Sequence, residues 1–194
     1  MAVFALHIRY RGDTPRRAEF VSRSAEALST LDGVGSFEHL DVENIRALVA
    51  TPRAVVDTTM VLLSDGDWAV GIGHGASAET AVAKATSCLT KKAKPGTVAA
   101  AVDAAGGVGP ADIVAVFMLI AQILTRRTPE GREATSFMRR GYSQIEAAEE
   151  LGISKQAMSQ RLQAAAWQAE NAGWQLAVNL LTRLDEATAS PPPR

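Results

Sequence analysis

The segment from Tyr142 to Leu162, YSQIEAAEELGISKQAMSQRL, constrains the fold of this chain more than any other stretch. Ser143 and Glu146 have the spacing of a capping box, in which the serine caps a helix and the glutamate reaches back to the serine amide. Gly152 supplies the positive φ angle that a sharp turn requires. Ser154 then stands where the N-cap of a second helix is expected. The pattern therefore predicts two short helices joined by a tight turn.

A third helix is predicted directly before this pair. Thr128 and Pro129 are an N-cap residue followed by proline at the first helical position. Gly141 is expected to end this helix, with Arg139 and Arg140 in its last turn, where cations suit the helix dipole.

The helix that follows Ser154 is predicted to have two chemically different faces. The inner face is expected to carry Met158, Leu162, Ala165 and Ala169. The outer face carries amides, hydroxyls and one amine: Lys155, Gln156, Ser159, Gln160 and Gln163. It has no acidic residue, and its groups are those that hydrogen-bond base edges and phosphates. For the preceding helix we expect a buried stripe of Ile145, Ala148 and Leu151.

These features together predict a helix-turn-helix, with a recognition helix over residues 155–166. The expected DNA contacts are Ser143, Ser154, Lys155, Gln156, Ser159, Gln160, Arg161 and Gln163, with Arg139, Arg140 and Arg161 on phosphates. No β-rich hairpin follows, so we expect no wing. The alternative is a helical hairpin that contacts another protein and no DNA.

The overall charge limits how this chain could bind DNA. The net charge is -1 and the isoelectric point is about 6.3, which excludes a uniformly basic surface. Any DNA contact must therefore come from a local patch, for which Arg139, Arg140, Lys155 and Arg161 are the candidates.

The rest of the chain divides into two classes of pattern. Strands are expected at 2–8, 36–40 and 67–75, helices at 15–31, 52–66 and 78–93, and a short strand within 94–110. From residue 111 onward the strand signals vanish. We therefore predict an α+β domain over 1–105, an all-α domain over 106–188 and a disordered tail over 189–194.

The last predicted helix has a wide apolar stripe, formed by Trp174, Ala177, Val178, Leu181 and Leu184. This stripe has two explanations: it packs on the apolar segment 113–124 of the same chain, or it forms the seam of a homodimer. We favour a contribution to a homodimer, since two-fold proteins that read two half-sites use such a helix.

The chain resembles a group of actinobacterial two-part proteins with a SatD-like N-terminal part and a C-terminal helix-turn-helix. The resemblance rests on ATPRAVVDTTMVLLSDGDWAVGIGHG (50–75), on AVAKATSCL (81–89) and, most specifically, on residues 141–181. It implies a DNA-binding regulator. For the N-terminal part it implies a ferredoxin-like α+β sandwich, distantly similar to nucleotide cyclase domains.

The chain departs from the cyclase-like pattern at one acidic turn. Val42, Glu43 and Asn44 stand there, and although Asp41 and Glu43 remain, the glycine and the paired carboxylates are gone. Two-metal phosphoryl chemistry needs carboxylates that converge on Mg²⁺. We therefore expect no enzyme activity, and a sensing or assembly role for this part.

The glycine-rich stretch GIGHGA, residues 71–76, superficially matches a dinucleotide-binding turn. A phosphate or nucleotide held by Gly71, Gly73, Gly75 and Lys84 is one explanation. The other is a strand that needs glycines for close packing, which we favour because the acidic residue about 20 positions on is missing.

The remaining signals predict little chemistry. The histidines are scattered, and the single cysteine, Cys88, excludes an internal disulfide, so we expect neither a metal nor a cofactor. The segment 113–124 is too short to span a bilayer. We expect a cytoplasmic protein, associated with the nucleoid when it binds DNA.

The sequence thus predicts a sequence-specific transcriptional regulator that binds double-stranded DNA as a homodimer, and it leaves open whether an unknown small-molecule effector binds to it. Two other classes stay open. One is a nucleotide- or small-molecule-binding protein whose helical part serves assembly. The other is an adaptor that contacts RNA polymerase.

Overall fold

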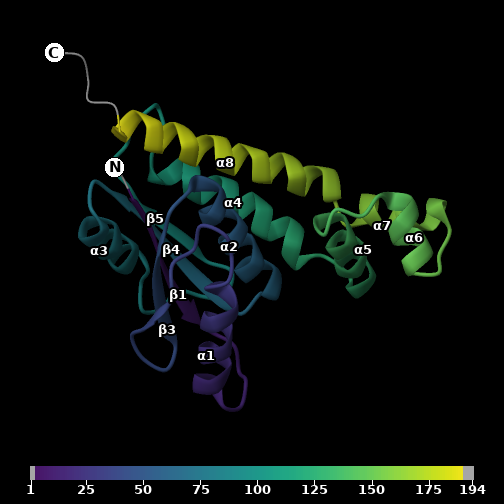
Figure 1. Cartoon of the computed structure of the whole chain (residues 1–194), viewed down its shortest axis with the longest axis horizontal. Coiled ribbons are helices and arrows are strands. Elements are labelled where there is room, and N and C mark those ends of the chain that lie inside the picture. The colour runs from purple at the N-terminus through teal and green to yellow at the C-terminus, as the bar shows by residue number, and fades with distance from the viewer. Residues whose placement is uncertain (1–2, 190–194) are drawn as a thin grey trace.

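The computed structural model describes residues 3–189 and contains one five-stranded sheet with helices around it (Figure 1). The sheet order is β2-β3-β1-β4-β5. Neighbouring strands are antiparallel except for β4 and β5, which are parallel. The elements are β1 (Val3–Tyr10), α1 (Arg17–Leu28), β2 (Glu38–His39), β3 (Asn44–Val49), α2 (Pro52–Asp65), β4 (Trp68–Gly75), α3 (Ala78–Cys88) and β5 (Val98–Ala101).

The first six elements follow the β-α-β-β-α-β order of a ferredoxin-like motif, which α3 and β5 extend at one edge. The sequence patterns located most of these elements within a few residues. They missed β3, and the helix expected over 78–93 ends at Cys88. The expected tail over 189–194 lies outside the described residues, apart from Ala189.

The central strand β1 is buried on both of its faces. Phe4, Leu6 and Ile8 belong to the main hydrophobic core, which also contains α1 and α2 residues. Ala5 instead packs with Ala81 of α3. Because both faces are covered, the strand is almost continuously apolar in sequence and does not alternate.

The glycines of β4 let α3 pack directly on the sheet backbone. A Cβ atom at Gly73 would clash with the carbonyl oxygen of Ala81, and one at Gly71 with that of Ala85. No side chain other than hydrogen fits these two positions without moving the helix. The close-packing explanation of the GIGHGA stretch is therefore the one that the geometry supports.

We expect Gly73→Ala to lower the free energy of unfolding by about 1–3 kcal/mol, the usual cost of overpacking a buried site. Urea denaturation followed by circular dichroism measures this loss. The matched control is Gly109→Ala, where an added Cβ meets no atom closer than 3.8 Å. An equal loss in the two variants would contradict the packing argument.

Two helices beyond residue 105 belong to the same core as the sheet. They are α4 (Pro110–Thr125) and α8 (Trp167–Ala189). The two helices run antiparallel to each other and lie beside α2 (Figure 1). Phe117 of α4 and Leu181 of α8 are buried in the same cluster as Phe4 of β1. The expected boundary at 105/106 therefore does not separate two hydrophobic cores, and the α8 stripe is largely used within the chain.

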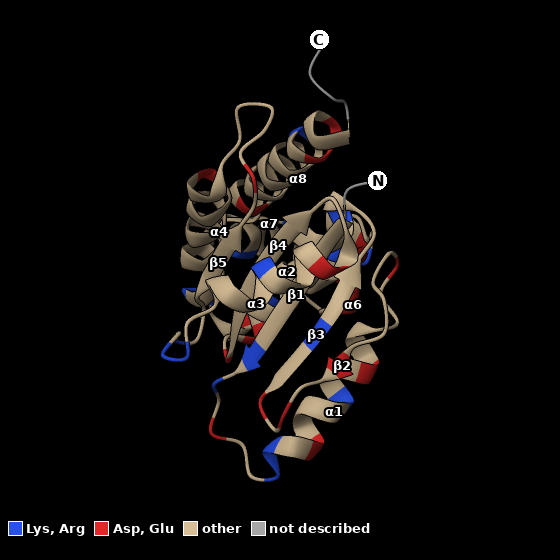
Figure 2. Cartoon of the chain, turned by 90° about the vertical axis from the view of Figure 1, so that its left-hand side faces the viewer, with Lys and Arg blue, Asp and Glu red and all other residues tan. Residues whose placement is uncertain are grey.

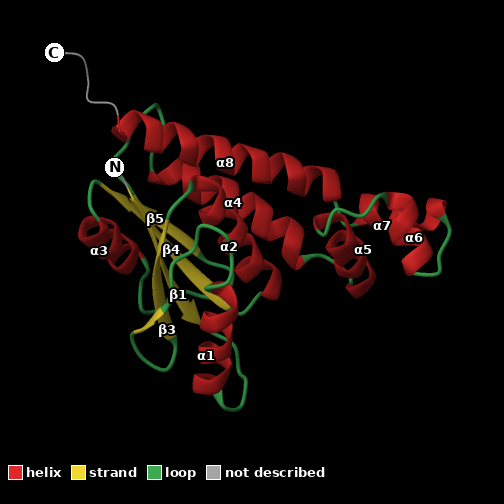
Figure 3. Ribbon diagram, viewed as in Figure 1, coloured by secondary structure: helices red, strands yellow, loops and turns green. Residues whose placement is uncertain are grey.

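A smaller helical unit lies between α4 and α8 in the sequence and extends from one end of them (Figures 1 and 3). It consists of α5 (Pro129–Arg139), α6 (Gln144–Glu150) and α7 (Lys155–Ala164). We call these three helices, residues 129–164, the HTH unit. The unit has a core of its own, in which Met158 and Leu162 of α7 pack on Ala134 of α5 and on Ala147 and Ala148 of α6.

Candidate nucleic-acid interface

The start of α6 has the capping box that its sequence predicts. The Glu146 amide donates to Ser143 Oγ at 3.3 Å, and the Ser143 amide donates to Glu146 Oε2 at 2.7 Å. These bonds satisfy two amides that a helix start otherwise leaves open. The bond from the Ser143 amide also lowers the pKa of the Glu146 carboxyl. The hydroxyl of Ser143 is thus engaged within the helix start.

The turn between α6 and α7 is closed by backbone bonds. Gly152 has a φ of +62°, and its amide donates to the Glu149 carbonyl at 3.1 Å. The Ile153 amide donates to the Ala148 carbonyl at 3.0 Å. This pair of bonds is a Schellman motif, which needs a left-handed residue at the glycine position. The Ser154 hydroxyl then accepts from the Ala157 amide at 3.1 Å and starts α7.

Three details of the predicted helices are wrong. Ile145 was expected in the buried stripe of α6 but is 51% exposed, because Ala147 and Ala148 form the inner face. Ala169 was expected on the inner side and is exposed. The recognition helix was expected to reach residue 166, but α7 ends at Ala164 because Ala166 adopts a positive φ of 53°.

The outer face of α7 is open to solvent. Lys155, Gln156, Ser159, Gln160 and Gln163 are all exposed, and Ser154 is exposed beside them. This face carries the amides, hydroxyls and amine that the sequence placed together. The neighbouring Glu149 and Glu150 are exposed on α6, so the acidic residues of this region lie on a different helix.

The predicted phosphate-binding arginines have different environments. Arg140 lies over two aromatic rings, with its guanidinium carbon 4.2 Å from the Phe137 ring centre and 5.1 Å from that of Tyr142. Arg161 is partly engaged, since its Nη1 lies 3.7 Å from Glu133 Oε2. Arg139 is turned toward α8, where its Nε and Nη2 donate to a buried carboxylate of Glu170 at 2.9 and 2.6 Å. Two of the three guanidinium nitrogens of Arg139 are therefore engaged with Glu170 inside the molecule.

The carboxylate of Glu170 joins the HTH unit to the rest of the molecule. It accepts from Arg139 of α5 and also pairs with Arg127 of the α4–α5 link. The side chains of Arg127 and Glu170 are both only 2% exposed. Arg127 further donates from Nε to the Ala165 carbonyl at 2.8 Å and from Nη1 to Thr135 Oγ1 at 3.4 Å. One buried cluster thus touches α5, the end of α7 and α8.

Sequence reasoning missed this cluster, although one signal was present. Glu170 interrupts an otherwise apolar helical stripe that includes Trp167, Trp174 and Ala177. A carboxylate at such a position is rarely buried unless it is paired. Burial lowers the pKa of Arg127, an effect that Glu170 opposes.

We expect Glu170→Gln to destabilise the protein by about 3–5 kcal/mol, because Arg127 would remain buried without its counter-charge. Hydrogen exchange measures the effect locally, and the largest loss of protection is expected in the HTH unit. Glu149→Gln, on the exposed side of α6, is the matched control. Unchanged protection of the unit in Glu170→Gln would mean that the ion cluster does not hold it in place.

The glycine-rich stretch is not arranged as a phosphate cradle. Gly71, Gly73 and Gly75 lie within β4, between β1 and β5, and are buried under α3. Lys84 does not turn to them; its Nζ lies 2.7 Å from Asp103 Oδ2. The four residues expected as a ligand site are therefore not brought together around an open space.

The two carboxylates that remain at the acidic turn, Asp41 and Glu43, bind other groups of the protein. Asp41 accepts from the amides of Glu43 and Asn44, each at 2.8 Å, and from the Asn44 side chain. Although burial acts to raise it, these hydrogen bonds hold the pKa of Asp41 below its usual value. Glu43 pairs with Arg11 and Arg17. These carboxylates are thus engaged with the protein's own donors.

The two buried histidines and the single cysteine are engaged within the protein. His7 Nε2 lies 3.0 Å from Asn44 Oδ1, whereas His74 Nε2 lies 3.1 Å from Asp185 Oδ1. Burial raises the pKa of Cys88 to about 11, so its thiol stays protonated near neutral pH. Within residues 3–189, no three His, Cys, Asp or Glu side chains are grouped to hold a metal ion. In the same range, no helix is long and apolar enough to cross a membrane.

Comparisons with known proteins add little to this geometry. No protein-family model matches the chain, and no curated protein matches it. Among solved structures, it has a weak likeness to a regulator of polyketide synthase expression from Bifidobacterium adolescentis. The sequence identity is 15%, the match covers 97% of this chain and 82% of that chain, and the TM-score is 0.25. We draw neither fold nor function from a likeness at this level.

Proposed function

We propose that this protein is a sequence-specific DNA-binding transcriptional regulator, with α7 as its recognition helix. The observation that carries the proposal is the outer face of α7, which is exposed, polar and free of acidic residues. The helix follows a Schellman turn and is capped by Ser154, and its exposed polar residues begin at its N-terminus, the part of a recognition helix that contacts base edges.

The placement of the HTH unit also supports DNA binding. The unit extends from the end of α4 and α8, away from the sheet (Figure 1). A recognition helix on such an extension can enter a major groove without a clash from the larger part of the protein. The buried cluster around Glu170 would keep the helix at a fixed angle to that part.

The charged residues of the HTH unit limit how much of the DNA affinity can come from phosphate contacts. Acidic and basic residues are interspersed over the molecule (Figure 2), and residues 129–164 contain five of each kind. With Arg139 engaged, we propose Arg140, Lys155 and Arg161 as the phosphate contacts. Three contacts give a shallow salt dependence, with a slope of log K against log salt of roughly -3 per protomer. Base contacts must then supply more of the affinity.

We expect the double variant Gln156→Ala/Gln160→Ala to lose a few kcal/mol of specific binding, because a good bidentate base contact contributes ~1–3 kcal/mol. Fluorescence anisotropy would use DNA from upstream of the protein's own gene, beside a scrambled duplex, at two salt concentrations. The control is Gln168→Ala/Gln175→Ala, which removes two exposed amides from α8. Parent-like specific binding by the α7 variant would rule out this face as the reading surface.

We propose that the regulator acts as a homodimer through the outer side of α4. This helix is apolar around most of its circumference, and Asp112 is its one charged residue. Met118 is 61% exposed and Leu119 is 66% exposed, while Leu176 of the adjacent α8 is 46% exposed. A helix that is apolar all round is normally buried. A second copy of the chain would cover this surface and place two recognition helices on two half-sites.

We expect Leu119→Lys to convert a dimer into a monomer, because a lysine ammonium would have to be buried in the seam. Analytical ultracentrifugation measures the change. Val42→Lys is the control, since Val42 is 56% exposed in a loop distant from α4 in the sequence. A parent protein that stays monomeric at high concentration would contradict the dimer proposal.

We propose no catalytic role for the sheet and its helices, because Asp41 and Glu43 are bonded to neighbouring donors. A DNA-binding regulator of this kind would act in the cytoplasm, on the nucleoid.

A further inference from the structure

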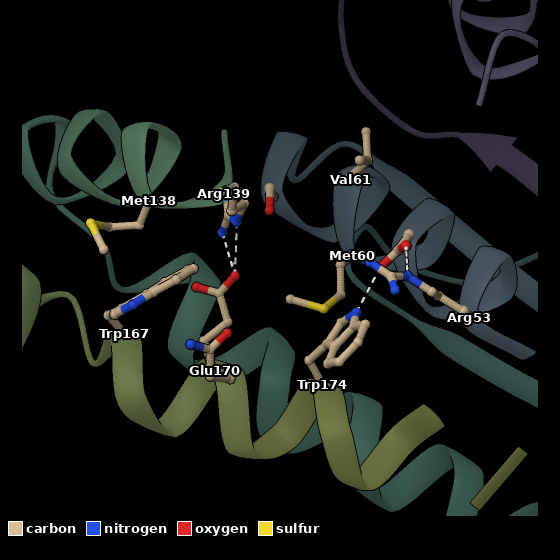
Figure 4. Close-up of a pocket in the computed structure, with 11 residues that line it drawn as sticks. Arg53, Met60, Val61, Met138, Arg139, Trp167, Glu170 and Trp174 are labelled. Atoms are coloured by element: carbon tan, nitrogen blue, oxygen red, sulfur yellow. Dashed lines mark hydrogen bonds and ion pairs between the residues drawn. The ribbon is translucent and has the colours of Figure 1, made fainter. Parts of the chain in front are cut away.

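A cleft lies where the HTH unit meets the rest of the molecule (Figure 4). Its walls come from α2, from the end of α5 and from the first turns of α8. Its volume is about 630 Å³, within the range of ~300–1,000 Å³ that is usual for small-molecule sites. The apolar lining consists of Met60, Val61, Met138, Trp167 and Trp174. Two indole rings and two thioethers suit a flat, apolar ring system.

The ring of Trp174 is held in place on the α2 side of the cleft. Its Nε1 donates to Asp57 Oδ1 at 2.6 Å. The guanidinium carbon of Arg53 lies 5.3 Å from the Trp174 ring centre, and Arg53 Nε lies 3.5 Å from Asp57 Oδ2. A pre-formed aromatic wall loses little side-chain entropy when a ligand packs on it.

The charge at the other end of the cleft is not balanced. Glu170 is a single carboxylate that faces two guanidinium groups, those of Arg127 and Arg139. Arg127 is buried beneath it, whereas Arg139 is half-exposed and lines the cleft. Both bonds from Arg139 to Glu170 come from Nε and Nη2, which leaves Nη1 available to a ligand. The cluster thus carries one surplus positive charge at the cleft.

From this combination we infer that the cleft binds a small planar aromatic acid. The ring system would pack between Trp167, Trp174 and the methionines, and the acid group would pair with Arg139. The ligand would touch both α2 and α5, so its binding would favour one orientation of the HTH unit. The binding itself does not depend on DNA, but its regulatory consequence rests on the function proposed above.

Isothermal titration of the full chain, without DNA, tests the binding. The probes are salicylate, 1-naphthoate and 9-anthracenecarboxylate, with 1-naphthalenemethanol as the neutral counterpart of the second. We expect at least one acid to bind with one site per chain. We expect 1-naphthalenemethanol to bind at least ~10-fold more weakly than 1-naphthoate, since hydrogen bonds to charged groups contribute ~1.5–3 kcal/mol. No saturable binding by any of the acids would overturn the inference. Equal binding of the alcohol would overturn its acid part.

Two variants locate the site. Arg139→Gln should weaken binding of the acid by ~10-fold or more, whereas Arg140→Gln, at the next residue outside the cleft, should bind as the parent does. Val61→Trp should block the cleft from its exposed rim and leave the Glu170 cluster intact. Val61→Trp also tests the site if Arg139→Gln folds less well than the parent. Parent-like binding by Val61→Trp, or equal losses in both arginine variants, would place the site elsewhere.

A second titration separates this inference from the proposed function. The DNA affinity of the parent is measured with and without the best acid, and we expect a change that Val61→Trp abolishes. If the acid binds but DNA affinity is unchanged, the regulatory part is overturned and the ligand site stands. If no DNA binds at all, the proposed function fails while the first titration still decides the ligand site.

Discussion

The arrangement of this protein depends on one buried carboxylate. Glu170 lies near the start of α8. It pairs with Arg127, which precedes α5, and with Arg139, the last residue of α5. A buried charge is costly unless it is compensated, and here two arginines compensate it. Through Arg127 the same cluster reaches the carbonyl of Ala165, the residue that follows α7. We expect this compact ionic joint to fix the direction in which the HTH unit points, and the candidate ligand cleft lies directly against it.

The joint connects two bodies of unequal size. The larger combines the sheet, α1, α2 and the pair α4 and α8 in one continuous core, with α3 packed on the other face of the sheet. The smaller is the HTH unit, whose separate core is built on Ala147 and Ala148. Because the chain leaves the larger body through α4 and returns through α8, the unit is fastened at both ends. That double attachment would let an event in the cleft or at the α4 surface change how α7 is presented.

Local signals in the sequence predicted much of this structure, and long-range contacts were beyond them. Ser143, Gly152 and Ser154 act within one turn of the chain, so capping and turn chemistry located α6 and α7 closely. The same reasoning assigned Arg139 to a phosphate contact. It did not find the actual partner, Glu170, because that residue is 31 positions away in the sequence. The strand β3 was missed and α4 was assigned to a separate domain for the same reason. Which element covers a given face is decided by packing, and the sequence pattern carries no record of it.

Selection from a random duplex pool shows whether the exposed face of α7 reads base sequence. The full chain is incubated with the pool, bound DNA is recovered, and the recovered sequences are read after several rounds. We predict enrichment of one motif, repeated with two-fold symmetry at a spacing near one helical turn. Recovery of unenriched sequences, or of none, from folded protein would contradict it and leave the HTH unit as a protein-binding surface.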